Sequence, residues 1–556
     1  MNWVNRMGRP LPAALTRQAA SVGFDHVNRR EFLALTTSFG ATAATAYAML
    51  GLPAPAQAST EESVEHDKSS IRIQMQVRAL TDPRTYSWFE IANFSRGWLE
   101  YLVTYENDGT FQPQLLQDWD INHEATEYTL HLRKGVTWNN GDKFTSEDVA
   151  RNIKMWCEKD VDGNSMTGRF AVLIDPTTNM AIEGAIQTPD AHTVKLVLPR
   201  ADISLIAGMA DYPAAIVHKS HTPETMLTNP VGTGPYLPER LEPGVGATLL
   251  RNNDHAWWNA GNGAWVEKIE FIDFGTDPSA AVQAAKAGQI DMTHTIEGSF
   301  IDVFNSFEGW VENEVITAAT IVIRPNQAVE IDGKTPYADV RVRRAIQLAV
   351  DNEILLELGY SGRGVTAENH HVSPQHPDYA TLPPITYDPV AARALMEDAG
   401  MLDFEHDLVS LDDDWRRNTA DAVAALMTDA GLKVRRTILP GNDYWDNWAK
   451  FGFSATEWGH RPLGVQTYAL AYRSGEAWNE FGWSNAEFDG LLEQALATLD
   501  NEKRRALMKK CEALVQNEGV TIQPFWRRLH NHTVEGLKGG EHHIAFEIRP
   551  AALRWT

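Results

Sequence analysis

The sequence has little cysteine, a deficit of basic residues and almost no long apolar run. Two cysteines in 556 residues exclude a disulfide framework and any cysteine-rich zinc or iron–sulfur site. Lysine and arginine number 49 against 74 acids, a formal net charge of −25. Such an acidic surface repels phosphate backbones, which excludes a nucleic-acid partner. A mean hydropathy of −0.33, with one apolar stretch near the N-terminus, excludes a polytopic membrane protein.

The remaining composition is that of a globular protein, with 43% hydrophobic and 22% charged residues. The length predicts two or three lobes. Residues 71–77, 129–133 and 194–198 alternate between apolar and polar and predict strands, whereas the periodicity of 340–358 predicts a helix. Strands and helices mix without a repeat, so the predicted fold class is α/β.

The first 58 residues have the features of an export signal. Arg29 and Arg30 precede a mildly apolar run over 32–52, and Ala58 ends a small-residue motif of the kind that a signal peptidase cleaves. This order predicts a twin-arginine signal peptide over 1–58, followed by a flexible leader over 59–70. The alternative is an ordinary N-terminal helix or a membrane anchor.

Removal of that segment leaves 44 basic and 72 acidic residues, a net charge of −28. We therefore expect a strongly acidic periplasmic protein. Cys157 and Cys511 could pair in that oxidising compartment, but they lie in unrelated helical patterns, which favours two buried free thiols.

Five segments, in order along the chain, resemble the extracytoplasmic solute-binding proteins of ABC transporters, family 5. Their sequence patterns cover residues 128–138, 140–149, 231–236, 339–351 and 387–400. The resemblance implies a two-lobed periplasmic binding protein that has an extra inserted domain and binds its ligand in the interlobe cleft. The implied divisions are 71–105 with 230–320 and 500–556 as lobe I, 106–229 as the inserted domain, and 321–499 as lobe II.

The resemblance also implies a function. The protein would capture a small organic solute, such as a short peptide or an opine-like compound with a carboxylate, and deliver it to ABC permease subunits in the inner membrane. It would act as a monomer, without catalysis, cofactor or metal of its own. A nickel or other metal chelate is the alternative ligand. An exported hydrolase is a weaker alternative, because no nucleophile elbow, Walker loop or zincin motif is present.

Tryptophan is abundant, with 18 residues, and its flat rings suit the walls of a solute site. Position and residue type give these ligand-binding candidates: Tyr86, Trp88, Arg169, Trp415, Arg416, Trp458, His460, Arg461 and Trp478. The segment 457–462 has His460 and Arg461 where peptide-binding relatives have an aspartate for the peptide ammonium. A guanidinium there favours a carboxylate ligand.

Each of these assignments has a structural alternative. Most of the tryptophans could be core residues. Arg461 could form an ion pair with a neighbouring acid such as Glu457. Asp413 and Asp414 could receive a ligand ammonium, although capping of the helix that begins near Trp415 is favoured. The pairs His370-His371 and His542-His543 would chelate a metal poorly, because adjacent side chains of an extended chain point to opposite faces. They are expected in surface loops instead.

Overall fold

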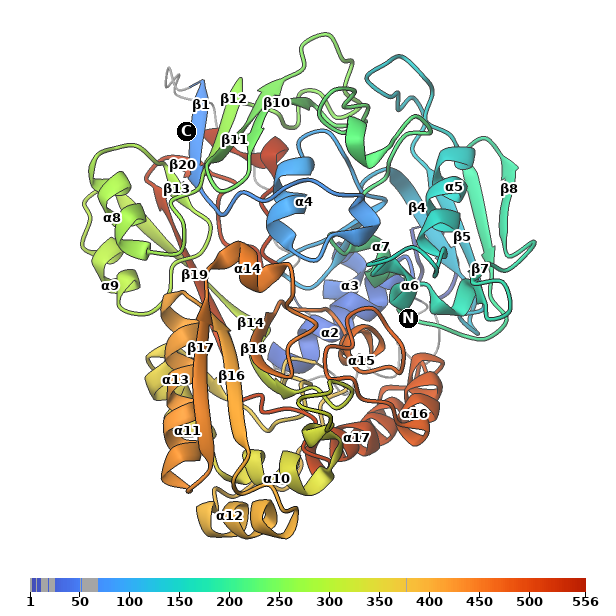
Figure 1. Ribbon diagram of the computed structural model, residues 1–556. Helices are drawn as coiled ribbons and strands as arrows, with labels where there is room; N and C mark the ends of the chain where they lie inside the picture. The colour runs from blue at the N-terminus through green and yellow to red at the C-terminus, as the bar shows by residue number, and fades with distance from the viewer. Residues whose placement is uncertain are drawn as a thin grey trace.

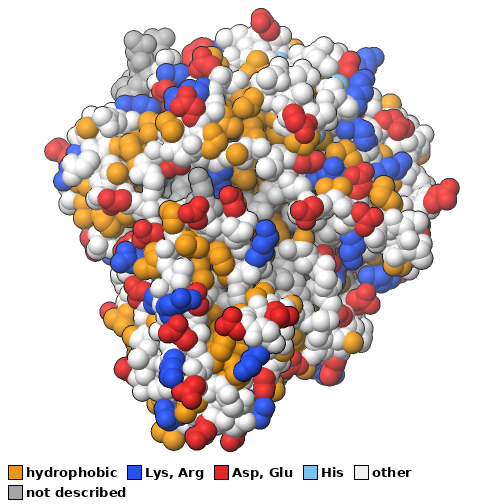
Figure 2. All heavy atoms as spheres, viewed as in Figure 1, with side chains coloured by type: hydrophobic (Ala, Val, Ile, Leu, Met, Phe, Trp, Pro, Cys, Tyr) orange, Lys and Arg blue, Asp and Glu red, His pale blue; other side chains and the backbone are white. Residues whose placement is uncertain are grey.

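In the computed structural model the chain forms two lobes that share one 11-stranded mixed sheet (Figure 1). The structure describes residues 3–6, 8–11, 19, 26–50, 52, 69–376 and 378–556. No helix among these residues has both the length and the apolar character needed to span a bilayer. Acidic and basic side chains are interspersed over the face shown in Figure 2, so the excess of acids does not form a single patch there.

Lobe I contains one half of the sheet, as the upper part of Figure 1 shows. Strand β1 confirms the alternation in the sequence, because Ile71 and Ile73 are buried while their neighbours are partly exposed. It lies parallel to its neighbours β12 and β13. The elements of this lobe are β1 (Ser70–Gln74), α4 (Phe89–Ser95), β10 (Tyr236–Glu242), β11 (Gly246–Arg251), β12 (Lys268–Ile272), α8 (Pro278–Lys286), β13 (Met292–Thr293) and α9 (Phe300–Asn305).

The segment 106–229, predicted to be an inserted domain, contains a separate four-stranded antiparallel sheet, ordered β4-β5-β9-β8. Helix α5 packs on β8 and β9, and the hairpin β2–β3 leads into the domain. Its elements are β2 (Val103–Tyr105), β3 (Phe111–Pro113), β4 (Leu116–Ile121), β5 (Glu127–Leu132), α5 (Ser146–Trp156), α6 (Met166–Arg169), β6 (Ile174–Asp175), β7 (Met180–Ala181), β8 (Ile186–Asp190), β9 (Thr193–Val197) and α7 (Leu205–Ala210).

The glycine-rich turn 231–236 joins the inserted domain to lobe I. A Cβ atom on Gly232 would lie 1.9 Å from the carbonyl oxygen of Trp98, and one on Gly234 would lie 2.8 Å from that of Gly97. Neither glycine has a positive φ. Glycine is therefore required at these two positions by the close approach of two backbone segments, and not by a left-handed conformation.

Lobe II contains the other end of the sheet and half of the α-helices of the described residues (lower part of Figure 1). The segment predicted as one helix over 340–358 is two helices, because Asp351 caps a new helix with bonds to the Glu353 and Ile354 amides. The elements are α10 (Val340–Leu348), α11 (Asn352–Tyr360), β15 (Gly364–Thr366), α12 (Pro389–Asp398), β16 (Glu405–Leu411), α13 (Asp414–Asp429), β17 (Lys433–Leu439), α14 (Gly441–Trp445), β18 (Phe453–Trp458), α15 (Gly464–Ala471), α16 (Ala486–Leu496) and α17 (Asn501–Asn517). The predicted division assigns α17 to lobe I, but the helix packs on α16 and is described here with lobe II.

Two long strands, β14 (Trp310–Pro325) and β19 (Phe525–Val534), cross between the lobes. The first half of β14 pairs with β19, and its second half pairs with β18 of lobe II. The register is irregular between Ile316 and Thr320, which marks the crossing point. We call β14 and β19 the hinge strands. The chain ends with the short pair β20 (Leu537–Lys538) and β21 (Arg554–Trp555).

The described residues of the N-terminal segment include the helices α2 (His26–Ser38) and α3 (Ala43–Met49). They pack on the inserted domain, where the Phe111 amide donates to Thr37 Oγ1 at 2.9 Å and the Trp119 indole donates to the Ser38 carbonyl at 2.5 Å. The prediction of a signal peptide over 1–58 gives no reason to expect these contacts. Ala58 and the flexible leader up to residue 68 lie outside the described residues.

The cysteines and the histidine pairs are all buried. Cys157 and Cys511 are free thiols, as the helical patterns favoured. The expectation of surface loops for His370-His371 and His542-His543 is wrong, because each of these rings is at most 7% exposed. Each ring bonds a separate polar partner; for example, His371 Nδ1 lies 2.9 Å from the Tyr472 hydroxyl.

Candidate ligand-binding cleft

Three neighbouring cavities that share lining residues lie at the junction of the lobes, with volumes of about 110, 30 and 20 Å³. The Phe89 ring, at the start of α4, lines all three. Lobe I contributes the end of β1 and the start of α8, and lobe II contributes the start of α13 and the end of β18. We call the largest cavity the acidic end of the cleft and the two smaller cavities its basic end.

The acidic end is lined by six carboxylates and one guanidinium, that of Arg416. The carboxylates are Glu90, Asp277, Glu297, Asp413, Asp414 and Glu457. Asp413 also caps α13 by accepting from the Arg416 amide at 3.1 Å, which confirms the predicted capping role. An excess of carboxylates in a confined site favours a cationic group on the ligand.

Two arginines hold this cluster together. Arg416 forms ion pairs with Asp413 and Glu457. Arg527, on hinge strand β19, bridges the lobes, because one nitrogen lies 2.6 Å from Glu297 of lobe I and another lies 3.0 Å from Glu457 of lobe II. These pairs offset part of the negative charge and join the two walls of the cleft.

The carboxylates at this end differ in their acidity. Burial raises the pKa of Glu297 to about 7, although Arg527 opposes the shift. Burial also opposes the ionisation of Glu457, but Arg416 and Arg527 together hold its pKa below the usual value. Glu457 is therefore charged at neutral pH, whereas Glu297 is near its titration point.

The basic end contains two arginines that share one aspartate. The Asp211 carboxylate, at the end of α7, lies 2.6 Å from Arg169 and 3.2 Å from Arg461 of lobe II. Burial opposes the ionisation of Asp211, but the two guanidiniums hold its pKa below the ordinary value. Two further acids, Glu457 and Glu547, line these cavities, but each is paired with other arginines. Arg461 is the arginine that lines both cavities, so it is the candidate partner for a ligand carboxylate.

Aromatic rings form the walls beside these arginines. The smaller cavities are lined by Trp88, Tyr212, Trp448, Trp458 and Trp478. The Trp458 and Trp478 ring centroids are 5.7 Å apart in an edge-on arrangement. The Trp458 indole donates to Glu480 Oε1 at 2.6 Å, which fixes the ring and satisfies its buried N–H. Rigid walls of this kind cover an apolar solute surface with little loss of entropy on binding.

The structure brings together most of the predicted ligand residues. The cavities are lined by Trp88, Trp415, Arg416, Trp458, His460, Arg461 and Trp478. Arg169 lies one layer behind the surface, bonded to Asp211 and stacked over Trp478 at 4.6 Å. Tyr86 is fully buried and does not line these cavities. A ligand contact remains a prediction for each of them.

The partner proposed for Arg461 is wrong in one detail. Glu457 pairs with Arg416 and Arg527, and Arg461 pairs with Asp211 instead. Asp211 is 250 positions away in the inserted domain, so no local pattern indicates this pair. Arg461 also lines both smaller cavities, which a purely structural ion pair does not require.

Several residues of the cleft have no signal in the sequence. Glu90 and Glu297 lie in ordinary helix and loop patterns, and Phe546 follows the histidine pair near the C-terminus. Phe89 and Phe546 stack with centroids 4.3 Å apart at the bottom of the cleft. Only the fold brings these segments together.

Comparisons with known proteins agree with this arrangement. Residues 110–480 match the model of bacterial extracellular solute-binding proteins, family 5. The dipeptide-binding protein of Escherichia coli is 24% identical over 470 residues, covering 78% of this chain and 85% of that protein. The nickel-binding periplasmic protein of the same species is 26% identical over 325 residues, or 54% and 55% of the two chains. The structure of AgaA from A. tumefaciens R10 in complex with agropinic acid superposes with a TM-score of 0.76 at 18% identity, covering 88% of this chain and 99% of the other.

Proposed function

The chain belongs to the bacterial extracellular solute-binding proteins of family 5, and from this membership we propose that it captures a small zwitterionic solute between its lobes. It delivers the solute, chemically unchanged, to the permease subunits of an ABC importer. Relatives named for dipeptides, agropinic acid and nickel support this class of function. Binding and release by lobe motion need no catalytic group.

The observation that carries the ligand class is the different charge of the side chains that line the two ends of the cleft. Six carboxylates line the acidic end, and Arg461 with its partner Asp211 lies at the other end, among tryptophans. A solute with an ammonium at one end and a carboxylate at the other would complement both ends. Short peptides and opine-like amino-acid derivatives have this chemistry.

The location follows from the proposed leader. A twin-arginine signal peptide over 1–58 would export the folded chain to the periplasm. Among the described residues, those that line the cavities all lie from Gln74 onward, so removal of the signal would leave these walls in place. The mature protein would act as a monomer that docks on the permease.

A metal chelate is the second candidate ligand. It is favoured by the nickel-binding relative and by the carboxylate-rich cavity, in which His294 lines the wall. The His294 ring is already bonded to the Phe546 carbonyl at 3.0 Å. An organic chelator would therefore supply most of the metal ligands.

Isothermal titration with a matched panel tests the proposal. The panel contains a dipeptide, its N-acetylated and C-amidated forms, an opine, nickel–histidine and a neutral disaccharide. We expect the unblocked zwitterions to bind, and each blocking group to weaken binding by about tenfold or more, because it removes a charged contact in a buried site. Tight binding of the neutral sugar alone, or equal binding of the blocked peptides, would reject the proposed ligand class.

A further inference from the structure

A second cluster of polar side chains lies away from the cleft, on the hinge strands. Antiparallel pairing places Glu312 of β14 opposite His532 of β19, and Glu314 opposite His530. Residues two apart on a strand share a face, so all four side chains project from the same side of this ladder.

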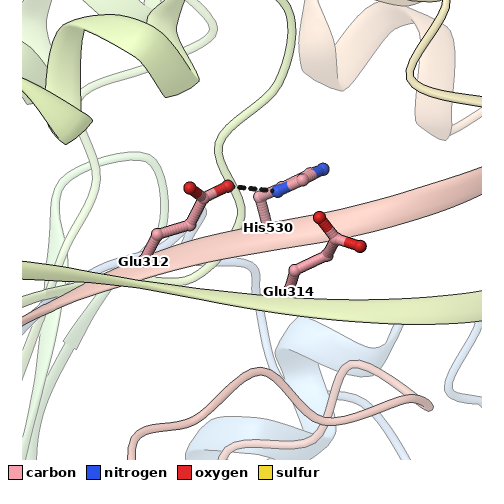
Figure 3. Close-up of side chains that lie close together, drawn as sticks. All are labelled: Glu312, Glu314 and His530. Carbon is pink, nitrogen blue, oxygen red and sulfur yellow. Dashed lines mark hydrogen bonds and ion pairs between the residues drawn. The ribbon is translucent and has the colours of Figure 1, made fainter.

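Three of these side chains converge closely enough to hold one ion. A nitrogen of His530 and one oxygen each from Glu312 and Glu314 all lie within 4.8 Å of one another. Figure 3 shows the imidazole beside both carboxylates, with one ring nitrogen directed at Glu312 and the other on the side of Glu314. The two carboxylates come from one strand and the imidazole from the other.

The hydrogen bonds of His530 determine which nitrogen is available. Its Nδ1 lies 2.7 Å from Glu312 Oε1, and a carboxylate can only accept, so Nδ1 carries the proton. The lone pair is then on Nε2. That atom is buried and has no hydrogen-bond partner among the described residues, in a side chain that is only 2% exposed.

A buried imidazole nitrogen without a partner is unfavourable in an apoprotein. The Glu314 carboxylate does not relieve it, because Glu314 Oε1 accepts from Arg528 Nη1 at 2.7 Å and no bond from Glu314 reaches the ring.

We propose that His530 Nε2 and the Glu314 carboxylate bind a divalent first-row transition ion on the hinge strands, with Glu312 orienting the imidazole. A carboxylate that holds the second nitrogen of a metal-bound histidine is a recurring arrangement, which fixes the ring and raises its basicity. One imidazole and one or two carboxylates suit Zn²⁺, and water completes the shell.

At this position a bound ion would link the two hinge strands. It would fasten β14 to β19 next to the irregular register between Ile316 and Thr320, where the strands pass from one lobe to the other. The His530 carbonyl also accepts from the amide of Ile296, a residue of the cleft wall, at 2.8 Å. An ion here would stiffen the support of the cleft without contacting the solute.

The test uses the EDTA-treated full chain and Zn²⁺ alone, followed by isothermal titration. We expect one zinc ion per chain, with Glu314→Gln and Glu312→Gln each weakening binding by about 10- to 100-fold. Glu314 is exposed, so its variant should fold even if a His530 variant does not. Glu242→Gln is the matched control, because Glu242 also pairs with an arginine on an exposed strand, at 3.0 Å, but has no histidine beside it.

Equal zinc affinity in the Glu314→Gln, Glu312→Gln and Glu242→Gln variants would overturn the proposal, as would the absence of zinc binding. Loss of binding on Glu297→Gln, with no change in Glu314→Gln, would place the ion in the cleft and would also overturn it. Thermal unfolding with and without Zn²⁺ provides the second readout. The wild-type chain should gain stability with zinc, and Glu314→Gln should not.

Discussion

Replacing Arg461 with alanine should weaken solute binding while the fold persists. The side chain lines both smaller cavities and stacks 5.8 Å from the Trp478 centroid. Its partner Asp211 retains Arg169 at 2.6 Å, so the substitution leaves no buried carboxylate without a counter-ion. The substitution therefore removes the proposed ligand contact, while Asp211 keeps its ion pair with Arg169.

The magnitude follows from the value of a buried charged contact. Truncation of one partner in such a contact loses about 2–5 kcal/mol, and about 1.4 kcal/mol is a factor of ten in Kd. Part of the Arg461 charge is offset by Asp211 at 3.2 Å, which favours the lower limit. We expect Kd to rise by about 30-fold. Arg461→Lys keeps the charge but loses the planar fork, so its effect should be smaller.

A double-mutant cycle identifies the ligand group involved. Calorimetry would compare the wild-type chain and Arg461→Ala, each with the free-acid and the C-amidated form of the best-binding dipeptide. If the guanidinium binds the carboxylate, amidation should have almost no further effect in the variant, because both changes remove the same contact. Fully additive losses would show that Arg461 recognises another part of the ligand.

The control is Arg341→Ala. Arg341 is 48% exposed and pairs with Asp339 at the start of α10, outside the cleft. Its removal should leave Kd unchanged. Unchanged affinity in Arg461→Ala as well would refute the reasoning and leave Arg461 as an ion pair of the closed lobes.

Three further predictions address other parts of the molecule. Binding of an ammonium-bearing ligand should weaken as the pH falls from about 8 to about 6, because the pKa of Glu297 is near 7 and its protonation removes negative charge. In Glu297→Gln this contribution to the pH dependence should be lost, so the slope measured by calorimetry should differ from that of the wild-type chain, and an unchanged slope would contradict this assignment. Gly232→Ala should lower the free energy of unfolding by about 3 kcal/mol in thermal unfolding, because its Cβ would lie 1.9 Å from the Trp98 carbonyl oxygen. Gly441→Ala, with no atom within 4 Å of the new Cβ, is the control, and an equal loss there would contradict this packing argument. A chain that begins at Ser59 should fold and bind the solute with the Kd of the full chain. Loss of binding would contradict this prediction and show that the N-terminal helices are required for solute binding.

Local patterns predicted much of the fold. The alternation of Ile71 and Ile73 predicted β1, and Asp413 caps α13 as expected. The break between α10 and α11 was missed because apolar periodicity continues across Asp351, whose capping bonds form only when the chain turns. The packing of α2 on Trp119 was missed because it depends on a distant strand.

The candidate site was less predictable. Residue type and position indicated Trp458, Arg461 and Trp478, which do line the cleft. The pairing of Arg461 with Asp211, and the contribution of Glu297 to the acidic end, join segments that are far apart in the sequence. The sequence contains no periodicity or motif that indicates such contacts, because they depend on how the lobes close.

The most direct test of solute capture is a crystal structure of the protein grown with the tightest-binding zwitterion of the panel. We predict density for the intact compound between the lobes, with its carboxylate at Arg461 and its ammonium among the carboxylates that surround Arg416. Density for a cleaved product, or a compound bound outside the interlobe cavities, would contradict the account.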